Sequence, residues 1–256
     1  MLEAYFDASG VSDPARVLSV AGYLFDEAKC KTLNARWTEL LEPFFYALPK
    51  NKRFFRMADF KERRIEPYCK MNDAERLSLH RELIDAASAA EPVVAMASVK
   101  RKDFENSTDQ QKRILVNPYL ACSVWCMNSL AAHVSKALPG SKIAYFLEAG
   151  DPGQGDLLMF LDRVAGNAKM SERFRYESHS AVQKHANHAL GVADILAWEY
   201  RTAIEQDILD QKLTDPRVFF NLMLKKPIDA IYLHPTNLSI HAMVQHFIKV
   251  QLDVSQ

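Results

Sequence analysis

Three acidic residues stand in apolar segments, where a carboxylate is costly unless it is paired or bound to a cation. Asp7 and Glu148 each end an apolar run, and Asp194 lies inside the apolar segment 190–198. Taken singly, each acid could equally face solvent at a strand end or at the boundary of an amphipathic helix. Carboxylates held close together repel one another unless a cation lies between them, and Mg²⁺ and Mn²⁺ prefer oxygen ligands. The three residues therefore predict a divalent metal site if the fold brings them together.

Hydrophobic periodicity predicts the elements that would position these acids. Strands are expected over residues 2–9, 17–25, 92–99, 141–148 and 173–180. Helices are expected from residue 26 to about 41, from 72 or 73 to about 89, from 117 to about 139, over 156–164, and from 187 or 188 onward. A further helix, an apolar run at 228–233 and a last helix at about 237–250 complete the prediction.

This order of elements predicts an α/β fold with a mixed β-sheet flanked by helices. A hairpin, a third strand and then alternating strands and helices is the order found in ribonuclease H-like domains. A single domain is expected over residues 1–256, with a helical or irregular insertion at about 26–91 after the second strand and a C-terminal extension at about 208–256. In that topology the first and fourth strands are neighbours, so Asp7 and Glu148 would meet, with Asp194 on a helix beside them.

Composition limits the partners and the location. Apolar residues make up 48% of the chain, and the 32 basic and 32 acidic residues cancel. Any contact with nucleic acid must therefore come from a local basic patch and not from net charge. No signal peptide is recognisable and no apolar run is long enough to span a membrane, which predicts a cytoplasmic protein without membrane association. The four cysteines form no C-x-x-C pair and are expected in the core.

Several other residues are candidates for contacting a substrate. Residues 50–64 alternate basic and aromatic side chains, a pattern that suits phosphate contacts and base stacking, with Arg53 and Arg56 as the candidates. A solvated basic loop explains the same pattern equally well. Further along, Lys184 could contact a phosphate, and one of three neighbouring histidines, among them His188, could act as a general acid or base.

Three short motifs stand out: Asp-Ala-Ser-Gly at residues 7–10, Arg-Met-Ala-Asp at 56–59 and Leu-Gly-Val-Ala-Asp-Ile-Leu-Ala at 190–197. In these motifs the chain resembles the family named domain of unknown function 3800, which is regarded as ribonuclease H-like. The family's opening Asp-Glu-Ser-Gly is here Asp-Ala-Ser-Gly at residues 7–10, and its late-helix motif Leu-Gln-x-Ala-Asp-(Leu/Ile)-x-Ala corresponds to residues 190–197. A His-x-x-Asp-like segment corresponds to residues 56–59. Three positions depart from the family pattern: Ala8 replaces the second acid, Arg56 the histidine and Gly191 the glutamine. The resemblance spans roughly residues 2–205.

The resemblance implies a retained metal site at Asp7, Glu148 and Asp194. It adds Asp59 as a fourth ligand or supporting group, with Glu62 a weaker choice, and Ser9 of the opening motif as a candidate substrate contact. Members of such families are often associated with mobile elements or with bacterial defence against phages, which is a further implication of the resemblance.

These observations support a metal-dependent nuclease that hydrolyses phosphodiester bonds of DNA or RNA with Mg²⁺ or Mn²⁺. An alternative is a catalytically inactive ribonuclease H-like module that binds nucleic acid or a protein partner, which Ala8, Arg56 and the zero net charge suggest. A third interpretation is an α/β enzyme of another class. It would be favoured if the three carboxylates lay more than about 10 Å apart, too far to share oxygen-ligated ions.

Overall fold

The computed structural model describes residues 1–11, 15–210, 243–245 and 247–248, without the side chains of 207–210. The apolar run predicted at 228–233 lies outside these residues, as does most of the last predicted helix. The division of the chain into one domain with a C-terminal extension therefore stays a prediction.

Five strands form one mixed sheet in the order β3-β2-β1-β4-β5. The strands are β1 (Leu2–Ser9), β2 (Val17–Asp26), β3 (Val93–Lys100), β4 (Ile143–Glu148) and β5 (Tyr176–Val182). β2 runs antiparallel to both of its neighbours, while β4 runs parallel to β1 and to β5. The predicted hairpin is confirmed, and so is the pairing of the first strand with the fourth.

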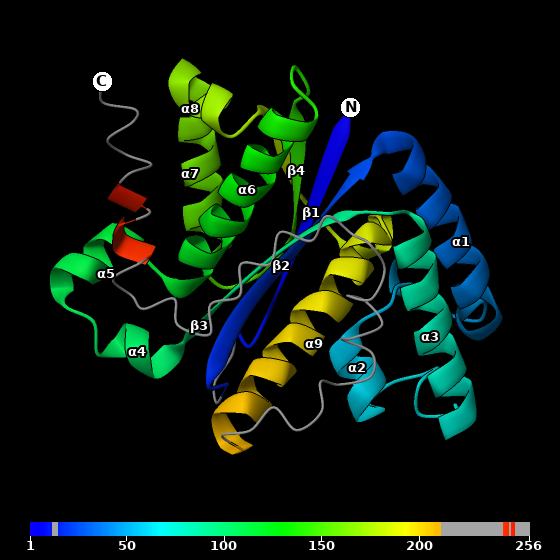
Figure 1. Cartoon of the computed structure of the whole chain (residues 1–256). Helices are drawn as coiled ribbons and strands as arrows, with labels where there is room; N and C mark the ends of the chain where they lie inside the picture. Colours follow the sequence, from blue (N-terminus) through cyan, green and yellow to red (C-terminus); the bar gives the residue numbers. More distant parts are fainter. Residues whose placement is uncertain (12–14, 211–242, 246, 249–256) are drawn as a thin grey trace.

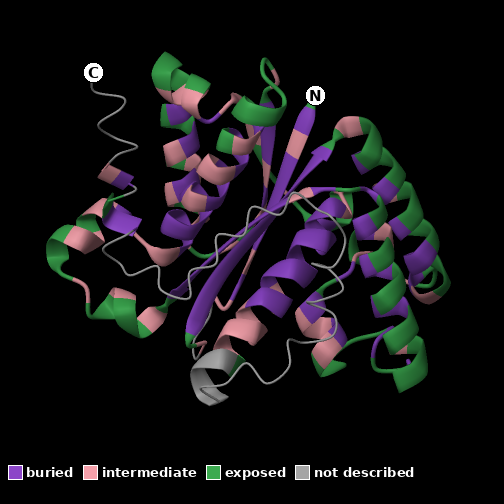
Figure 2. Cartoon of the chain, in the orientation of Figure 1, coloured by how far each residue is buried: buried purple, intermediate pink, exposed green. Residues whose placement is uncertain are grey.

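Helices cover both faces of the sheet (Figure 1). A cluster of buried hydrophobic side chains fills the space on each side. On one side lie α6 (Pro118–Ala137), α7 (Gln154–Gly166) and α8 (Ala168–Arg173); on the other lie α1 (Glu27–Phe45), α2 (Met57–Glu62), α3 (Asp73–Ala89) and α9 (Ala189–Asp210). The central strands β1 and β2 are buried along almost their whole length (Figure 2), because each face of the sheet is covered. The predicted α/β architecture is confirmed.

Polar or proline-containing segments form helices that periodicity does not predict. α4 (Arg101–Glu105) and α5 (Asp109–Leu115) occupy a stretch between the third predicted strand and the helix predicted from residue 117, where no element is predicted. A capping box begins α5, in which Thr108 and Gln111 each bond the other's backbone N–H, so the helix needs no long apolar face. α1 continues through Pro43, which lies in its last turn, where only one backbone hydrogen bond is lost.

No single helix among the described residues is long and apolar enough to cross a membrane. α5 and α6 are long and apolar enough only when they are taken together, and this pair is bent by 53°. Eleven residues of α6 are buried within the protein, where the helix packs on the sheet.

Gly191 allows a tryptophan to pack against α9. A Cβ atom built at Gly191 would lie 2.7 Å from Cζ3 of Trp37, a fully buried side chain of α1. The glycine therefore accommodates a side chain from a helix. Because Trp37 occupies this space, the larger glutamine of the resembling family would not fit here without repacking.

We expect Gly191→Ala to destabilise the fold by about 1–3 kcal/mol, because the added methyl group overpacks against Trp37. Gly155→Ala is the matched control: it lies in α7, and a Cβ there meets nothing within 4 Å. The control should be neutral or stabilising by up to about 1 kcal/mol, because alanine favours helices. Urea denaturation measures both changes, and equal midpoints for the two variants would contradict the packing argument.

Candidate metal centre

Adjacent parallel strands bring Asp7 and Glu148 together. Side chains alternate along each strand, and the face that carries Asp7 and Glu148 is the one covered by α9. The register pairs Phe6 with Leu147, so Asp7 and Glu148 are the next residues along the two strands. Asp7 is 1% exposed, and the backbone N–H of Ala8 donates to its Oδ1 over 2.7 Å.

Asp194 reaches the same place from α9, and the insertion holds it there. The carboxylate is 7% exposed, and its Oδ2 accepts a 2.6 Å hydrogen bond from the backbone N–H of Met57. Met57 is the first residue of α2, where the N–H groups have no partner inside the helix. One function of the insertion after β2 is therefore to orient Asp194.

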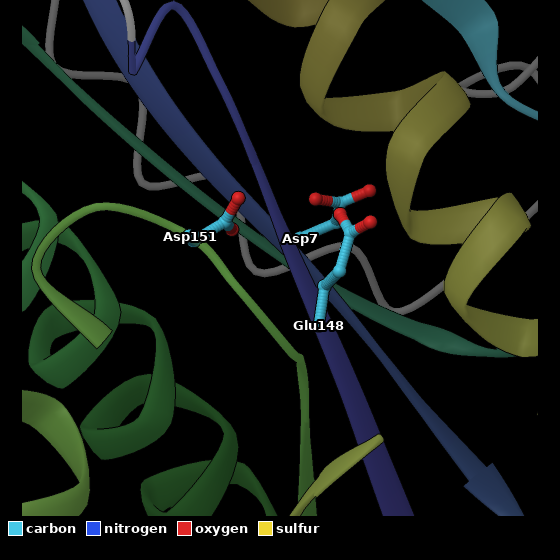
Figure 3. Close-up of side chains that lie close together, drawn as sticks. All are labelled: Asp7, Glu148 and Asp151. Atoms are coloured by element: carbon cyan, nitrogen blue, oxygen red, sulfur yellow. The ribbon is translucent and has the colours of Figure 1, made fainter. Parts of the chain in front are cut away.

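Asp151 is a fourth acid at the centre, to which the sequence interpretation assigned no role. One ligand atom each of Asp7, Glu148 and Asp151 lie within 4.8 Å of one another (Figure 3). Asp151 lies in the loop after β4, where Gln154 donates to the Glu148 carbonyl and accepts from the Gly150 N–H. The Oδ2 atom of Asp151 is buried and has no hydrogen-bond partner within the described part of the chain. The signal in the sequence that could have identified Asp151 was its position three residues after Glu148.

Lys184 places a positive charge among these acids. Its Nζ lies 2.8 Å from Asp7 Oδ2, 2.9 Å from Glu148 Oε2 and 3.4 Å from Asp194 Oδ2. The lysine side chain is 4% exposed and belongs to a 3₁₀ turn, η2 (Lys184–Ala186), that immediately precedes α9. The three ion pairs show that Asp7, Glu148 and Asp194 surround one point, so the wide separation that would have favoured an α/β enzyme of another class is not found.

The cluster carries more negative charge than Lys184 can neutralise. Burial raises the pKa of Asp7 to about 7, although the charge of Lys184 opposes this rise. Burial and the charge of Asp7 raise the pKa of Asp151 to about 7, and burial raises the pKa of Asp194 to about 6. Burial disfavours the charge of Lys184, but the carboxylates outweigh that effect and raise its pKa. Four carboxylates around one ammonium thus offer oxygen ligands and an electrostatic site for a further cation.

Two clefts meet at this cluster. The larger has a volume of about 720 Å³ and the smaller about 410 Å³. Both are lined by Arg56, Glu148, Asp151 and Lys184, so the clefts share the acidic centre. Beyond it, the larger cleft continues past Trp198, and the smaller past other residues of the insertion and of the η2 turn.

Some of the other predicted residues line the larger cleft, and the rest line neither cleft. Arg56, Asp59 and Ser9 line the larger cleft, although Ser9 accepts a 2.9 Å hydrogen bond from Arg201. Arg53 lines neither cleft: it donates to the carbonyls of residues 46 and 48 at the end of α1. His188 also lines neither cleft, and its backbone N–H donates to Asn34 while its ring lies beside Trp37. Burial lowers the pKa of the His188 imidazole.

The basic and aromatic segment 50–64 is largely structural. Phe55 and Phe60 pack in the core with Tyr68, so neither is available for base stacking. Phe54 and Arg56 do reach the clefts. The alternation of basic and aromatic residues therefore reflects the packing of the insertion on α1 and α3 more than a continuous binding strip.

The strand order, with only β2 running against the other strands, and the acids on β1, β4 and α9 define a ribonuclease H-like fold. A chain of the PCNA:RNase HII complex from Archaeoglobus fulgidus is 14% identical over 83% of this chain and 77% of that chain, with a TM-score of 0.40. Ribonuclease H2 from Pyrococcus horikoshii OT3 is 13% identical over 97% of this chain and 100% of that chain, also with a TM-score of 0.40. No protein-family model and no curated protein matches. At these values neither structure assigns an activity or a residue role to this chain.

Proposed function

We propose that this protein is a divalent-metal-dependent nuclease that hydrolyses phosphodiester bonds in DNA or RNA. The proposal rests on one observation: Asp7, Glu148, Asp151 and Asp194 converge at the edge of a ribonuclease H-like sheet, where two clefts reach them. Carboxylate oxygens are the ligands that Mg²⁺ and Mn²⁺ prefer. The buried Oδ2 of Asp151, which has no hydrogen-bond partner among the described residues, fits such an ion.

Each acid has a distinct place in the proposed site. Asp7, Glu148 and Asp151 would hold the ion, because their oxygens already lie close enough to share it. Asp194, fixed by the Met57 N–H, would complete the site from the side of α9. A bound Mg²⁺ or Mn²⁺ supplies Lewis-acid stabilisation of charge on a phosphate and lowers the pKa of water.

Charged and aromatic groups along the clefts support a nucleic-acid substrate. Arg16 and Arg56 line the larger cleft, are exposed, and make no ion pair within the part of the chain that the structure describes. Either guanidinium could bind a phosphate group near the acids. Phe54, which lines the smaller cleft, offers an aromatic ring for contact with a base.

The test is cleavage of end-labelled single-stranded and double-stranded DNA, RNA and RNA–DNA hybrid by the chelator-stripped protein. We expect at least one substrate to be cut when Mn²⁺ or Mg²⁺ is added and none when EDTA is present. Asp194→Asn should lose the cleavage, which excludes a contaminating nuclease. Absence of cleavage by a protein that demonstrably binds metal would contradict the nuclease proposal.

One observation favours a second candidate, the inactive ribonuclease H-like module. The ammonium of Lys184 lies among the carboxylates, at a point where a metal ion would need the same oxygens. A module of this kind would bind nucleic acid or a protein partner without turnover in any metal. Membership of the domain of unknown function 3800 family, a role in defence or mobile elements and a cytoplasmic location stay predictions.

Substitution of each residue tests whether Asp151 or Asp59 is the fourth metal-binding acid. We expect Asp151→Asn to weaken Mn²⁺ binding about 10–100-fold, the range typical of residues that support a metal site. Asp59→Asn is the matched control and should leave the affinity near the wild-type value, because Asp59 lines the cleft outside the cluster. Isothermal titration calorimetry measures both. The reverse order of effects would show that Asp59 is the ligand.

A further inference from the structure

Lys184 is buried within the acidic centre, beside the acids that it contacts. Its side chain is 4% exposed, and its Nζ contacts three carboxylates that come from three different elements. A buried ammonium is costly unless several anions compensate it, so this arrangement is specific to the lysine and is not an incidental surface ion pair.

The oxygens that bind Lys184 belong to the acids that would bind a metal. Nζ contacts Asp7 Oδ2 and Glu148 Oε2 over 2.8 and 2.9 Å, and both residues belong to the candidate metal group. An ammonium at this position and a divalent cation bound to the same carboxylates would repel each other strongly in a buried site. Both cations cannot keep full contact with Asp7 and Glu148.

We propose that Lys184 is an internal counter-ion of the carboxylate cluster, which competes with divalent metal for Asp7 and Glu148 and withdraws when the metal binds. The proposal rests on the proposed metal-dependent function and adds a device that sets the metal affinity. Without metal, Lys184 keeps the buried acids assembled. When metal binds, the Lys184 ammonium can move into either cleft, because Lys184 lines both of the clefts that meet at the cluster.

The first test is calorimetric titration of Mn²⁺ into the wild type, Lys184→Met and Lys61→Met. Methionine keeps much of the length of the lysine side chain but removes its charge. We expect Lys184→Met to bind Mn²⁺ about tenfold more tightly or better. Lys61→Met is the control for the loss of any nearby positive charge, since Lys61 lies over the Trp198 ring at the cleft and not among the acids. Its affinity should stay near the wild-type value.

A second measurement on the wild type does not depend on a variant that folds. Amine acetylation followed by mass spectrometry reports the accessibility of each lysine. We expect Lys184 to be protected in metal-free protein and to react faster with saturating Mg²⁺. Lys142, an exposed residue that pairs with Glu177 outside the cluster, should react equally in both states. Unchanged or slower acetylation of Lys184 in protein that has bound metal would overturn the withdrawal.

The outcomes separate this proposal from the proposed function. If the wild type binds Mn²⁺ and Lys184→Met binds it no more tightly, the competition is overturned and the metal site stands. If neither the wild type nor Lys184→Met binds Mn²⁺ or Mg²⁺, the metal-dependent function fails, and the competition fails with it.

Discussion

Replacing Asp7 with asparagine is expected to abolish divalent-metal binding and to lower any nuclease activity at least about 100-fold, while stabilising the metal-free protein. Burial raises the pKa of Asp7 to about 7, so above neutral pH the fold holds a carboxylate that it disfavours. Asparagine removes that charge, and its carbonyl can still accept the hydrogen bond from the Ala8 N–H. The free energy of unfolding of the metal-free variant should exceed that of the wild type by about 1–4 kcal/mol above neutral pH.

Chemical denaturation in EDTA, together with Mn²⁺ calorimetry and a cleavage assay, measures the three effects of Asp7→Asn. Asp85→Asn, an exposed acid on α3, is the matched control and should change none of them. Opposite effects on stability and function distinguish a metal-binding acid from a structural one. Loss of stability in metal-free Asp7→Asn would mean that Asp7 serves chiefly as the partner of Lys184.

Stability without metal is expected to fall as the pH rises from about 4 to about 7, and added Mg²⁺ should restore it only near the upper end of that range. In the folded protein the pKa values of Asp7 and Asp151 are about 7 and that of Asp194 about 6, above the ordinary value of 3.8. Between pH 3.8 and about 7 the folded state therefore binds more protons than the unfolded state. Raising the pH therefore favours unfolding until the acids have ionised, whereas metal binding requires the ionised acids.

Thermal unfolding with EDTA and with Mg²⁺, across this pH range, measures the effect. The rise in melting temperature caused by Mg²⁺ should be small at about pH 5 and reach its full value above about pH 7. Asp7→Asn serves as the control, because other groups titrate in the same range and only the difference between the two proteins reports on the cluster. An equal rise at both ends would contradict metal binding by acids with raised pKa values.

The sequence was sufficient to predict the part of the site that depends on topology. Asp7, Glu148 and Asp194 each interrupt or end an apolar run, and the order of strands and helices places those runs side by side. The segments that carry the acids are largely buried and therefore read as apolar runs, so these elements were also the easiest to predict. The hairpin, the pairing of β1 with β4 and the position of α9 beside them agree with the order of elements found in ribonuclease H-like domains.

The parts that depend on loops and on distant side chains could not be predicted. Asp151 lies in a Gly-Asp-Pro-Gly turn, a composition that indicates a turn and says nothing of where its carboxylate points. Lys184 was expected to contact a phosphate, but the η2 turn directs its ammonium to the acids. The pairing of Gly191 with Trp37 joins two helices far apart in sequence, and no local pattern reveals it.

The insertion also shows why a basic segment is weak evidence of a nucleic-acid surface. Arg53 satisfies backbone carbonyls at the end of α1, and Arg63 pairs with Asp73. Only part of the segment, including Arg56, faces the clefts. Its clearest contribution to the site is a backbone group, the Met57 N–H that fixes Asp194.

Anomalous X-ray diffraction from crystals soaked in Mn²⁺ tests the central claim most directly, because it locates the ion without reference to activity. We predict a manganese peak bonded to oxygens of Asp7 and Glu148, at about 2.0–2.2 Å, with the Lys184 ammonium moved away from them. A cluster without a manganese peak, with Lys184 still bound to Asp7 and Glu148 at saturating Mn²⁺, would contradict the account and favour the inactive module.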